Sequence, residues 1–446
     1  MTKLHKLGLH ALSGLIARRE VSALELTDAL IARCEAVTET HALITPTFER
    51  ARDTARLRDA ELARGDINGP LHGIPVAIKD AFAVAQVPTT LCGQFTPDQD
   101  ADALHNLDSA GMPLLGKLHC AEYCLGAPGG QDMLPFARNP YDPARSPGGS
   151  SSGSAVALAA GMVPATLGTD TGGSIRIPAA FCGIAGLKPT GGLISTRGVF
   201  PLAPALDQVG PMARDSRDCA LLMDALVPGL SCADGLTERL DGLRIGFVAQ
   251  FGVDAGVASD QRGAVVRALE VLEDLGAVVS EARLPPLQDF TDSYLPLMLF
   301  EAYALHADAV ANDENMSRNT RFRLQGGADI DAAGAKRAQS QRQHLTQMVE
   351  ALWTQFDALV FEIVPGNPPL VENIRPLDYL NAPMLAVPAN LTNAPSLTIR
   401  CGTSQIGLPI GMQIVGPRMR DANLLRVGHA FELATGQTGA PVDPVS

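Results

Sequence analysis

The sequence predicts an α/β protein in which strands and helices alternate along the chain. Residues 74–78, 112–118 and 163–167 are short apolar runs with the length of buried strands, and segments of helical character separate them. This alternation is typical of a sheet covered by helices. Of the 446 residues, 46% are hydrophobic and 19% are charged, which excludes a disordered chain.

The N-terminal sixty residues are predicted to be largely helical. Ser22 and Glu25 have the spacing of a capping box, and apolar residues recur at steps of three and four from Ala23 to Val37. A second, charged helix is expected over 48–64. Such helices cover either a sheet or a partner protomer, so a homodimer with these helices at its seam is a further hypothesis.

The rest of the chain continues the alternation. Residues 285–350 are predicted to be mostly helical, with a break at Gly326-Gly327. No internal repeat or long linker interrupts the pattern. Strands are expected at 243–248, 277–280, 359–364, 396–401 and 410–415, and helices at 154–160, 261–275 and 423–434.

The charge balance limits the partners. The chain has 35 Lys and Arg residues against 48 Asp and Glu residues, a net charge of −13. Binding to nucleic acid or to an anionic membrane is therefore disfavoured. The N-terminus lacks the clean apolar run of a signal peptide, and no apolar stretch reaches the roughly 18 residues of a membrane-spanning helix. We expect a cytoplasmic protein.

Eight cysteines occur without a zinc-binding pattern. No CxxC pair is present, and Cys120 and Cys124 have no second close pair to complete a ligand set. The pattern favours scattered, buried thiols in a reducing compartment and predicts no metal site.

Two Gly/Ser-rich segments are the strongest candidates for a site. Residues 147–153 read PGGSSSG, and residues 168–176 contain a glycine-rich loop over 169–174. Gly/Ser clusters are usually loops or linkers, but each of these borders an apolar element, so we expect them to meet at one site. Neither has the lysine of a P-loop or the GxGxxG of a dinucleotide-binding turn, which disfavours nucleotide binding.

A serine in these segments needs a base. None of the nine histidines lies in either segment and no GxSxG surrounds Ser150 or Ser174, although a triad can also form from distant positions. Lys79 follows the apolar run Val76-Ala77-Ile78. Burial disfavours a charged ammonium, and a neutral amine is a competent general base. The local pattern alone favours a lysine that is solvated or paired with Asp80.

Six longer motifs resemble those of the amidase signature family. The resemblance covers about 60–215 and 385–434, and residues 216–384 are not diagnostic. The matching segments are, in chain order, 72–80 (HGIPVAIKD), 146–155 (SPGGSSSGSA), 168–176 (GTDTGGSIR), 181–190 (FCGIAGLKPT), 207–211 (DQVGP) and 407–413 (GLPIGMQ).

The resemblance implies a fold and a domain organisation. The fold would be a single α/β/α sandwich around a large mixed sheet, with one domain over 1–446. Its parts would be a helical N-terminal segment (1–65), the signature core (66–215), a divergent substrate-side region (216–384), and the C-terminal strands and helix (385–446).

The resemblance also implies a Ser–Ser–Lys triad. Ser174 would be the nucleophile, Ser150 the relay on a cis peptide bond after Gly149, and Lys79 the base. Backbone N–H groups of four consecutive residues would form the oxyanion hole: Thr171, Gly172, Gly173 and Ser174. The reaction would be two-step amide hydrolysis through an acyl-serine, with no metal or organic cofactor. Asp170 and Arg176, which flank the nucleophile, are expected to shape the loop by ion pairing.

Substrate identity is less well specified. By the same resemblance Cys124 would border the substrate together with Ser150. A loop rich in proline, 364–369, is predicted to form a wall, with Phe300, Tyr303 and the 129–132 loop as further candidates. No arginine stands out as a carboxylate clamp, which favours a weakly polar or aryl amide over a dicarboxylate half-amide.

The main hypothesis is a free-standing amidase acting on a small-molecule amide. One alternative is the glutaminase subunit of a tRNA-dependent amidotransferase; Ile177 stands where such subunits typically carry glutamine, which argues against it. Another is a non-catalytic binding protein, disfavoured because Lys79, Ser150 and Ser174 are all present. A third is an esterase using the same residues.

Ser152 replaces a glycine found in many relatives, which is expected to leave catalysis intact.

Overall fold

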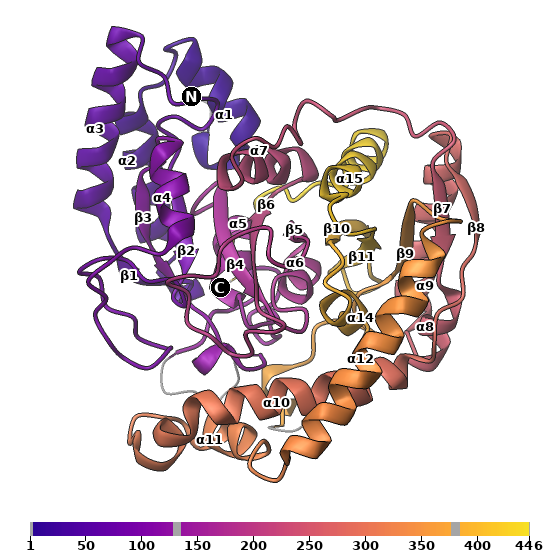
Figure 1. Cartoon of the computed structure of the whole chain (residues 1–446). Helices are drawn as coiled ribbons and strands as arrows, with labels where there is room; N and C mark the ends of the chain where they lie inside the picture. The colour runs from indigo at the N-terminus through magenta and orange to yellow at the C-terminus, as the bar shows by residue number, and fades with distance from the viewer. Residues whose placement is uncertain (1–2, 128–134, 376–383, 446) are drawn as a thin grey trace.

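One mixed sheet of eleven strands organises the chain in this computed structural model, which describes residues 3–127, 135–375 and 384–445 (Figure 1). In spatial order the strands are β1 (Leu43–Pro46), β3 (Leu114–Leu118), β2 (Val76–Lys79), β4 (Ala165–Asp170), β6 (Gln208–Ala213), β5 (Ala185–Lys188), β10 (Ser396–Thr403), β11 (Pro409–Val415), β9 (Ala358–Glu362), β7 (Arg244–Phe247) and β8 (Val278–Glu281). The strands from β4 to β9 pair antiparallel, whereas β2 with β3 and β4, and β7 with β8 and β9, pair parallel.

Helices cover both faces of this sheet, which confirms the predicted α/β/α sandwich. Helices α5 and α6 contact each other and the central strands, while α15 contacts both α7 and α9 in the second layer. The helices are α1 (Leu9–Ala17), α2 (Ala23–Ala36), α3 (Phe48–Arg64), α4 (Asp102–Ser109), α5 (Ser152–Ala159), α6 (Arg176–Cys182), α7 (Ser216–Leu226), α8 (Ala249–Asp254), α9 (Ser259–Asp274), α10 (Leu287–Asn312), α11 (Arg318–Gln325), α12 (Ala332–Leu352), α14 (Val387–Leu391) and α15 (Asp421–Thr435).

The N-terminal helices form much as the sequence predicts. Ser22 caps α2 by accepting a hydrogen bond from the Glu25 backbone N–H at 3.1 Å, and the Glu25 carboxylate accepts one from the Ser22 N–H at 2.9 Å. The apolar stripe of α2 is buried within this chain, so it does not itself provide a dimer seam. The predicted largely helical segment is interrupted at β1, an edge strand paired with β3 that the sequence did not indicate. An edge position tolerates Pro46, because the missing N–H is not needed there.

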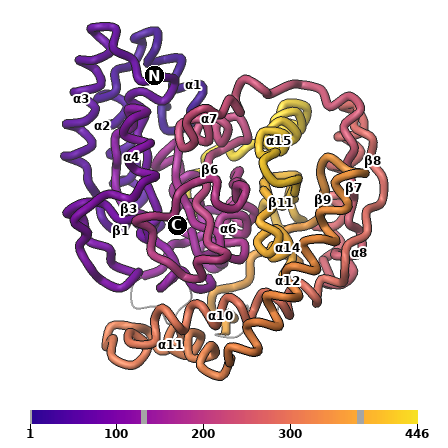
Figure 2. The backbone as a smooth tube through the Cα atoms, viewed as in Figure 1, coloured from indigo at the N-terminus to yellow at the C-terminus, as the bar shows by residue number. Residues whose placement is uncertain are grey.

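Helices α10, α11 and α12 form what we call the helical arm. It runs along the lower side of the view, away from α1 and α3 (Figure 2). The predicted break is confirmed: α11 ends at Gln325 and α12 begins at Ala332. Gly327 packs closely on α10, where a Cβ would lie 2.1 Å from the Leu299 carbonyl oxygen. Across the described ranges, none of the helices has the length and hydropathy of a transmembrane segment.

Candidate active site

Lys79 ends strand β2 and is fully buried. Its Nζ donates hydrogen bonds to Ser150 Oγ at 2.7 Å and to Thr169 Oγ1 at 2.6 Å. The alternative of a solvated lysine or a Lys79–Asp80 pair is therefore wrong, since Asp80 instead pairs with Lys117 at 3.0 Å. The apolar strand thus places the Lys79 amine among hydroxyl groups, out of contact with solvent.

The loop before α5 carries Ser150. The peptide bond between Gly149 and Ser150 is cis, as the resemblance implied. Gly148 has a φ of +79°, and a Cβ there would lie 2.8 Å from Pro178 Cα, so this turn requires glycine. The Ser151 N–H donates to the Ser174 carbonyl oxygen at 3.1 Å. The two Gly/Ser-rich segments therefore meet, as predicted from the sequence.

A buried ion pair fixes the loop that holds Ser174. Asp170 and Arg176 are both fully buried and lie 3.0 Å apart. Burial acts to raise the pKa of Asp170, but the Arg176 guanidinium outweighs it and holds this pKa well below its usual range. The Asp170 carboxylate also accepts the N–H groups of Gly173 at 2.8 Å and Ile175 at 3.1 Å. The predicted structural role of this pair is confirmed.

Arg176 extends this anchoring to the C-terminal part of the chain. Its guanidinium donates to the Ala386 carbonyl oxygen at 2.8 Å, to Asn390 Oδ1 at 2.6 Å and to Gln413 Oε1 at 3.1 Å. Strand β11 and helix α14 thus support a loop formed more than 200 residues earlier in the sequence.

The backbone of the loop differs in one respect from the expected oxyanion hole. The Gly173 N–H, one of the four donors expected there, already donates to Asp170 Oδ1 at 2.8 Å, which leaves Thr171, Gly172 and Ser174 as the remaining candidates. A Cβ on Gly172 would lie 2.1 Å from Tyr294 Oη of the helical arm, so a larger residue there would have to displace the Tyr294 ring. Strand β4 also runs beyond its predicted end at residue 167, to Asp170, which places Thr169 beside Lys79.

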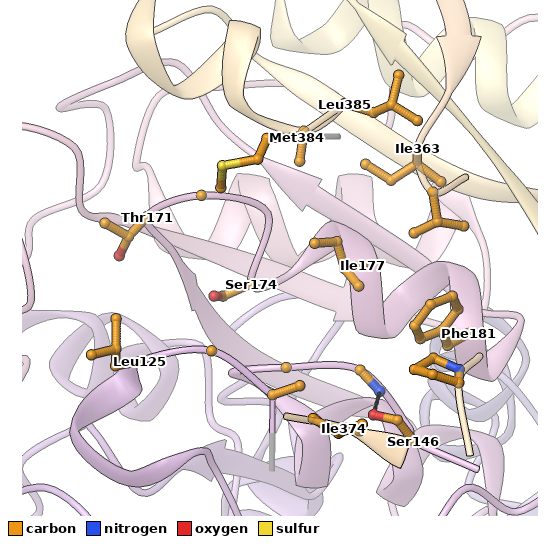
Figure 3. Close-up of a pocket in the computed structure, with 18 of the residues that line it drawn as sticks. Leu125, Ser146, Thr171, Ser174, Ile177, Phe181, Ile363, Ile374, Met384 and Leu385 are labelled. Atoms are coloured by element: carbon orange, nitrogen blue, oxygen red, sulfur yellow. Dashed lines mark hydrogen bonds between the residues drawn. The ribbon is translucent and has the colours of Figure 1, made fainter. Parts of the chain in front are cut away.

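Ser174 opens onto a cavity of about 530 Å³. Figure 3 shows Ser174 with Ile177, Phe181 and Ile363 on one side and Leu125 and Thr171 on the other. The wall is largely apolar. It combines residues of the signature core with Tyr294 and Met298 of α10, and with the segment after β9: Ile363, Val364, Pro365, Gly366, Asn367 and Pro369.

The substrate-side predictions have mixed outcomes. The 364–369 loop lines the cavity, as predicted. Among the described residues, Phe300 and Tyr303 do not line it, because other positions of α10 face the cavity. The 129–132 loop lies outside the described residues. Arg323 and Arg375 also line the cavity, although no local pattern in the sequence marks them.

Cys124 lines the cavity and belongs to a cluster of three thiols. Its Sγ lies 3.7 Å from Cys92 Sγ, which lies 3.8 Å from Cys120 Sγ. Burial raises the pKa of the Cys92 and Cys120 thiols. All eight cysteines are buried and free, as expected, but these three are gathered rather than scattered. No spacing in the sequence indicates this cluster, since Cys92 comes from a different segment.

Asp207 is a further residue whose role the sequence left open. It lies within the DQVGP motif, and its carboxylate accepts a hydrogen bond from Thr171 Oγ1 at 2.6 Å. The same carboxylate accepts the N–H groups of Leu202 and Ala203. Asp207 thereby fixes the start of the loop that carries Ser174, so the motif itself was the available signal.

The fold and the site together define the class: an enzyme that hydrolyses amides. The chain belongs to the Amidase family, whose family model matches residues 25–425. It is 36% identical to a glutamyl-tRNA(Gln) amidotransferase subunit from Chloroflexus aurantiacus, over 98% of each chain. Two solved structures are also similar. One is a crystal structure of an amidase (32% identity, TM-score 0.87, covering 96% of this chain and 100% of that one). The other is the native peptide amidase of Stenotrophomonas maltophilia (28% identity, TM-score 0.85, covering 99% and 98%).

Proposed function

We propose that this protein hydrolyses a carboxylic amide through an acyl-enzyme formed on Ser174, with Ser150 as the relay and Lys79 as the base. The observation that carries the proposal is the hydrogen bond of 2.7 Å between Lys79 Nζ and Ser150 Oγ, in a loop tied to the Ser174 backbone. A serine hydroxyl is a weak nucleophile until a neighbouring group accepts its proton, and the buried Lys79 amine reaches that proton through Ser150.

The reaction then has two halves. Ser174 Oγ attacks the amide carbon and passes its proton to Ser150, whose own proton goes to Lys79. The oxyanion lies against the N–H groups of Thr171, Gly172 and Ser174, each worth about 3–4 kcal/mol in the transition state. The C–N bond breaks as the nitrogen takes a proton back through Ser150. Water then attacks the acyl-serine by the same relay and releases the acid.

The acyl group is proposed to be apolar. Ile177, Phe181 and Ile363 form a continuous apolar wall beside Ser174 (Figure 3). An apolar wall gains free energy by burying a hydrocarbon or aryl group and disfavours a charged one. This favours a free-standing amidase, in which the substrate is a small amide and Cys124 and Ser150 border it.

A second candidate is glutamine hydrolysis within a larger amidotransferase. The similarity to a protein named as an amidotransferase subunit, over almost the whole of both chains, favours this candidate more strongly than it favours a free-standing amidase. In this case the chain would act with partner proteins. Arg323 and Arg375 at the cavity would then be the candidates to bind the glutamine carboxylate.

One experiment separates the two. The purified chain is given a panel of aliphatic amides, anilides and glutamine, and release of ammonia or amine is measured beside Ser174→Ala. Turnover of an apolar amide, lost in the variant, supports the free-standing amidase. Turnover of glutamine alone supports the second candidate. Activity that persists in Ser174→Ala contradicts the proposed nucleophile.

A further inference from the structure

Three cysteine sulfur atoms lie close together next to the cavity. They are the Sγ atoms of Cys92, Cys120 and Cys124, and all lie within 4.8 Å of one another. Cys120 follows strand β3, Cys124 ends a short 3₁₀ turn over Glu122–Cys124, and Cys92 comes from the loop after β2. Cys92 and Cys120 are fully buried, while Cys124 also lines the cavity.

The backbone holds this arrangement in place. Tyr123 and Cys124 have φ values of +53° and +58°, a left-handed conformation that non-glycine residues seldom adopt. The Tyr123 N–H donates to the Leu91 carbonyl oxygen at 3.0 Å, and the buried Asp80 carboxylate accepts the Leu91 N–H at 2.7 Å. These bonds tie the turn carrying Cys124 to the segment carrying Cys92. The sulfur cluster is therefore built by the fold and does not depend on side-chain rotation alone.

The sulfur separations match a metal site. Tetrahedral thiolate ligands at about 2.3 Å from Zn²⁺ are about 3.8 Å apart, and Cys92 Sγ lies 3.7 Å from Cys124 Sγ and 3.8 Å from Cys120 Sγ. A disulfide would require two of these atoms to approach by about 1.7 Å more. We propose that Cys92, Cys120 and Cys124 bind one thiophilic divalent ion of the Zn²⁺ or Cd²⁺ type.

Coordination has a defined chemistry at this site. Each of the three thiols releases its proton to solvent as a metal–sulfur bond forms, and no oxidant or reductant takes part. The ion enters from the cavity, because Cys124 is the member of the cluster that lines it. The Lys79 amine interacts electrostatically with the Cys120 and Cys124 thiols, so an ion bound by these thiols lies near the Lys79–Ser150 pair. Loading should therefore inhibit hydrolysis, and a chelator should restore it.

The test is a Cd²⁺ titration of the full chain without added thiols. Ultraviolet thiolate-to-metal charge-transfer absorption is followed, which reports binding independently of activity. We expect one equivalent per chain with the intensity of three thiolates, and at least a tenfold weaker affinity in Cys92→Ala and in Cys124→Ala. The matched control is Cys219→Ala. Cys219 is equally buried but lies in helix α7 and does not belong to the cluster. It should bind Cd²⁺ like the wild type.

The opposite results overturn the inference. The inference is wrong if the wild type shows no saturable Cd²⁺ binding at one equivalent. It is also wrong if the charge-transfer intensity is unchanged in both cluster variants. If these variants misfold, X-ray absorption at the cadmium edge of the loaded wild type decides instead, because fewer than three sulfur neighbours contradicts the site. This test holds even if Ser174 proves not to be the nucleophile.

Discussion

The signature core and the helical arm contribute to the same cavity in different ways. In the core, Lys79, Asp170 and Arg176 are fully buried, and each is held by two or more hydrogen bonds to named partners. The arm presents Tyr294 and Met298 of α10, and Arg323 of α11, to a largely apolar cavity. A buried polar network has a single satisfied arrangement, because each lost partner leaves another group unpaired. In an apolar wall, by contrast, one side chain can be replaced by another of similar volume without leaving a polar group unpaired.

This difference assigns separate tasks to the two regions. In the proposed reaction, the core would set where the reacting atoms lie, and the cavity wall, to which the arm contributes, would set which substrate groups fit beside them. Substitutions in the core network should therefore affect rate or stability severely, whereas those in the wall or the arm should alter substrate preference or stability modestly.

The largest expected effect is that of Ser174→Ala. We expect a fall of about 10⁶-fold in kcat, comparable with the loss of a nucleophile in serine hydrolases, and no mass adduct when the reaction is stopped and the protein is weighed. Ser152→Ala is the matched control, since its hydroxyl lies 3.2 Å from His119 Nδ1 and not beside Lys79. An acyl adduct in Ser174→Ala would show that another residue is acylated.

Next in size is the joint effect of Lys79→Met and Ser150→Ala. Each should lower kcat by about 10⁴-fold, and the double variant should be no worse than the poorer single one, because the residues act as one relay. Steady-state kinetics of the three variants test this, with circular dichroism to verify folding. Multiplicative losses would mean that the two residues act independently.

Asp170→Asn should lower the free energy of unfolding by about 3–5 kcal/mol, since it leaves Arg176 buried without its counter-charge. Denaturant unfolding measures this. The folded pKa of Asp170 lies below its unfolded value, so the pair stabilises the protein above the unfolded pKa of about 4 and loses this contribution as the pH falls further. The gap between variant and wild type should therefore narrow in acid.

The surface pair of Asp102 and Arg197 provides the comparison for that result. Its arginine side chain is 82% exposed, so solvent screens the pair and Asp102→Asn should leave the free energy of unfolding almost unchanged. Equal losses of unfolding free energy in the two variants would mean that burial does not increase the contribution of the Asp170–Arg176 pair.

A substitution in the cavity wall should have a smaller effect on activity. Ile177→Gln places an amide group on the apolar side of Ser174 and should lower kcat/KM for an apolar amide by about 10–100-fold. Ile177→Leu, which conserves volume, should stay near the wild type. Kinetics with one apolar anilide and with glutamine test both. A gain on glutamine would support the second candidate function.

The smallest effect is expected in the arm itself. Asp331 caps α12 by accepting the Gly334 N–H at 2.6 Å, and Asp331→Ala should cost about 1 kcal/mol of stability. Thermal unfolding should show a lower Tm, with kcat unchanged at a temperature well below it. A fall in kcat there would mean that the arm positions the reacting groups as well as the wall.

The sequence predicted most of the sheet and several helices but missed two central strands. Periodic apolar residues and a capping box located α2 and α9 closely. Strands β5 and β6 were not predicted, because Gly186, Gly210 and Pro211 weaken any strand pattern. Their glycines are explained only by packing: a Cβ on Gly210 would lie 2.1 Å from the Leu187 carbonyl oxygen.

Some residues of the candidate site could likewise be predicted from the sequence, and others could not. Motifs placed Lys79, Ser150 and Ser174 in segments that the structure brings together, although their catalytic roles remain predictions. The cluster of Cys92 with Cys120 and Cys124, and the cavity positions of Arg323 and Arg375, depend on tertiary packing between distant segments. No local spacing encodes such proximity.

The bonds from Arg176 to Asn390 and Gln413 have a consequence for protein synthesis. A ribosome makes the chain from its N-terminus, so the loop that holds Ser174 emerges more than 200 residues before the groups that anchor it. Until residue 413 has left the exit tunnel, the guanidinium lacks its Gln413 partner and the loop is incompletely supported. We therefore expect the site to reach its complete hydrogen-bonded arrangement only when the chain is almost fully translated.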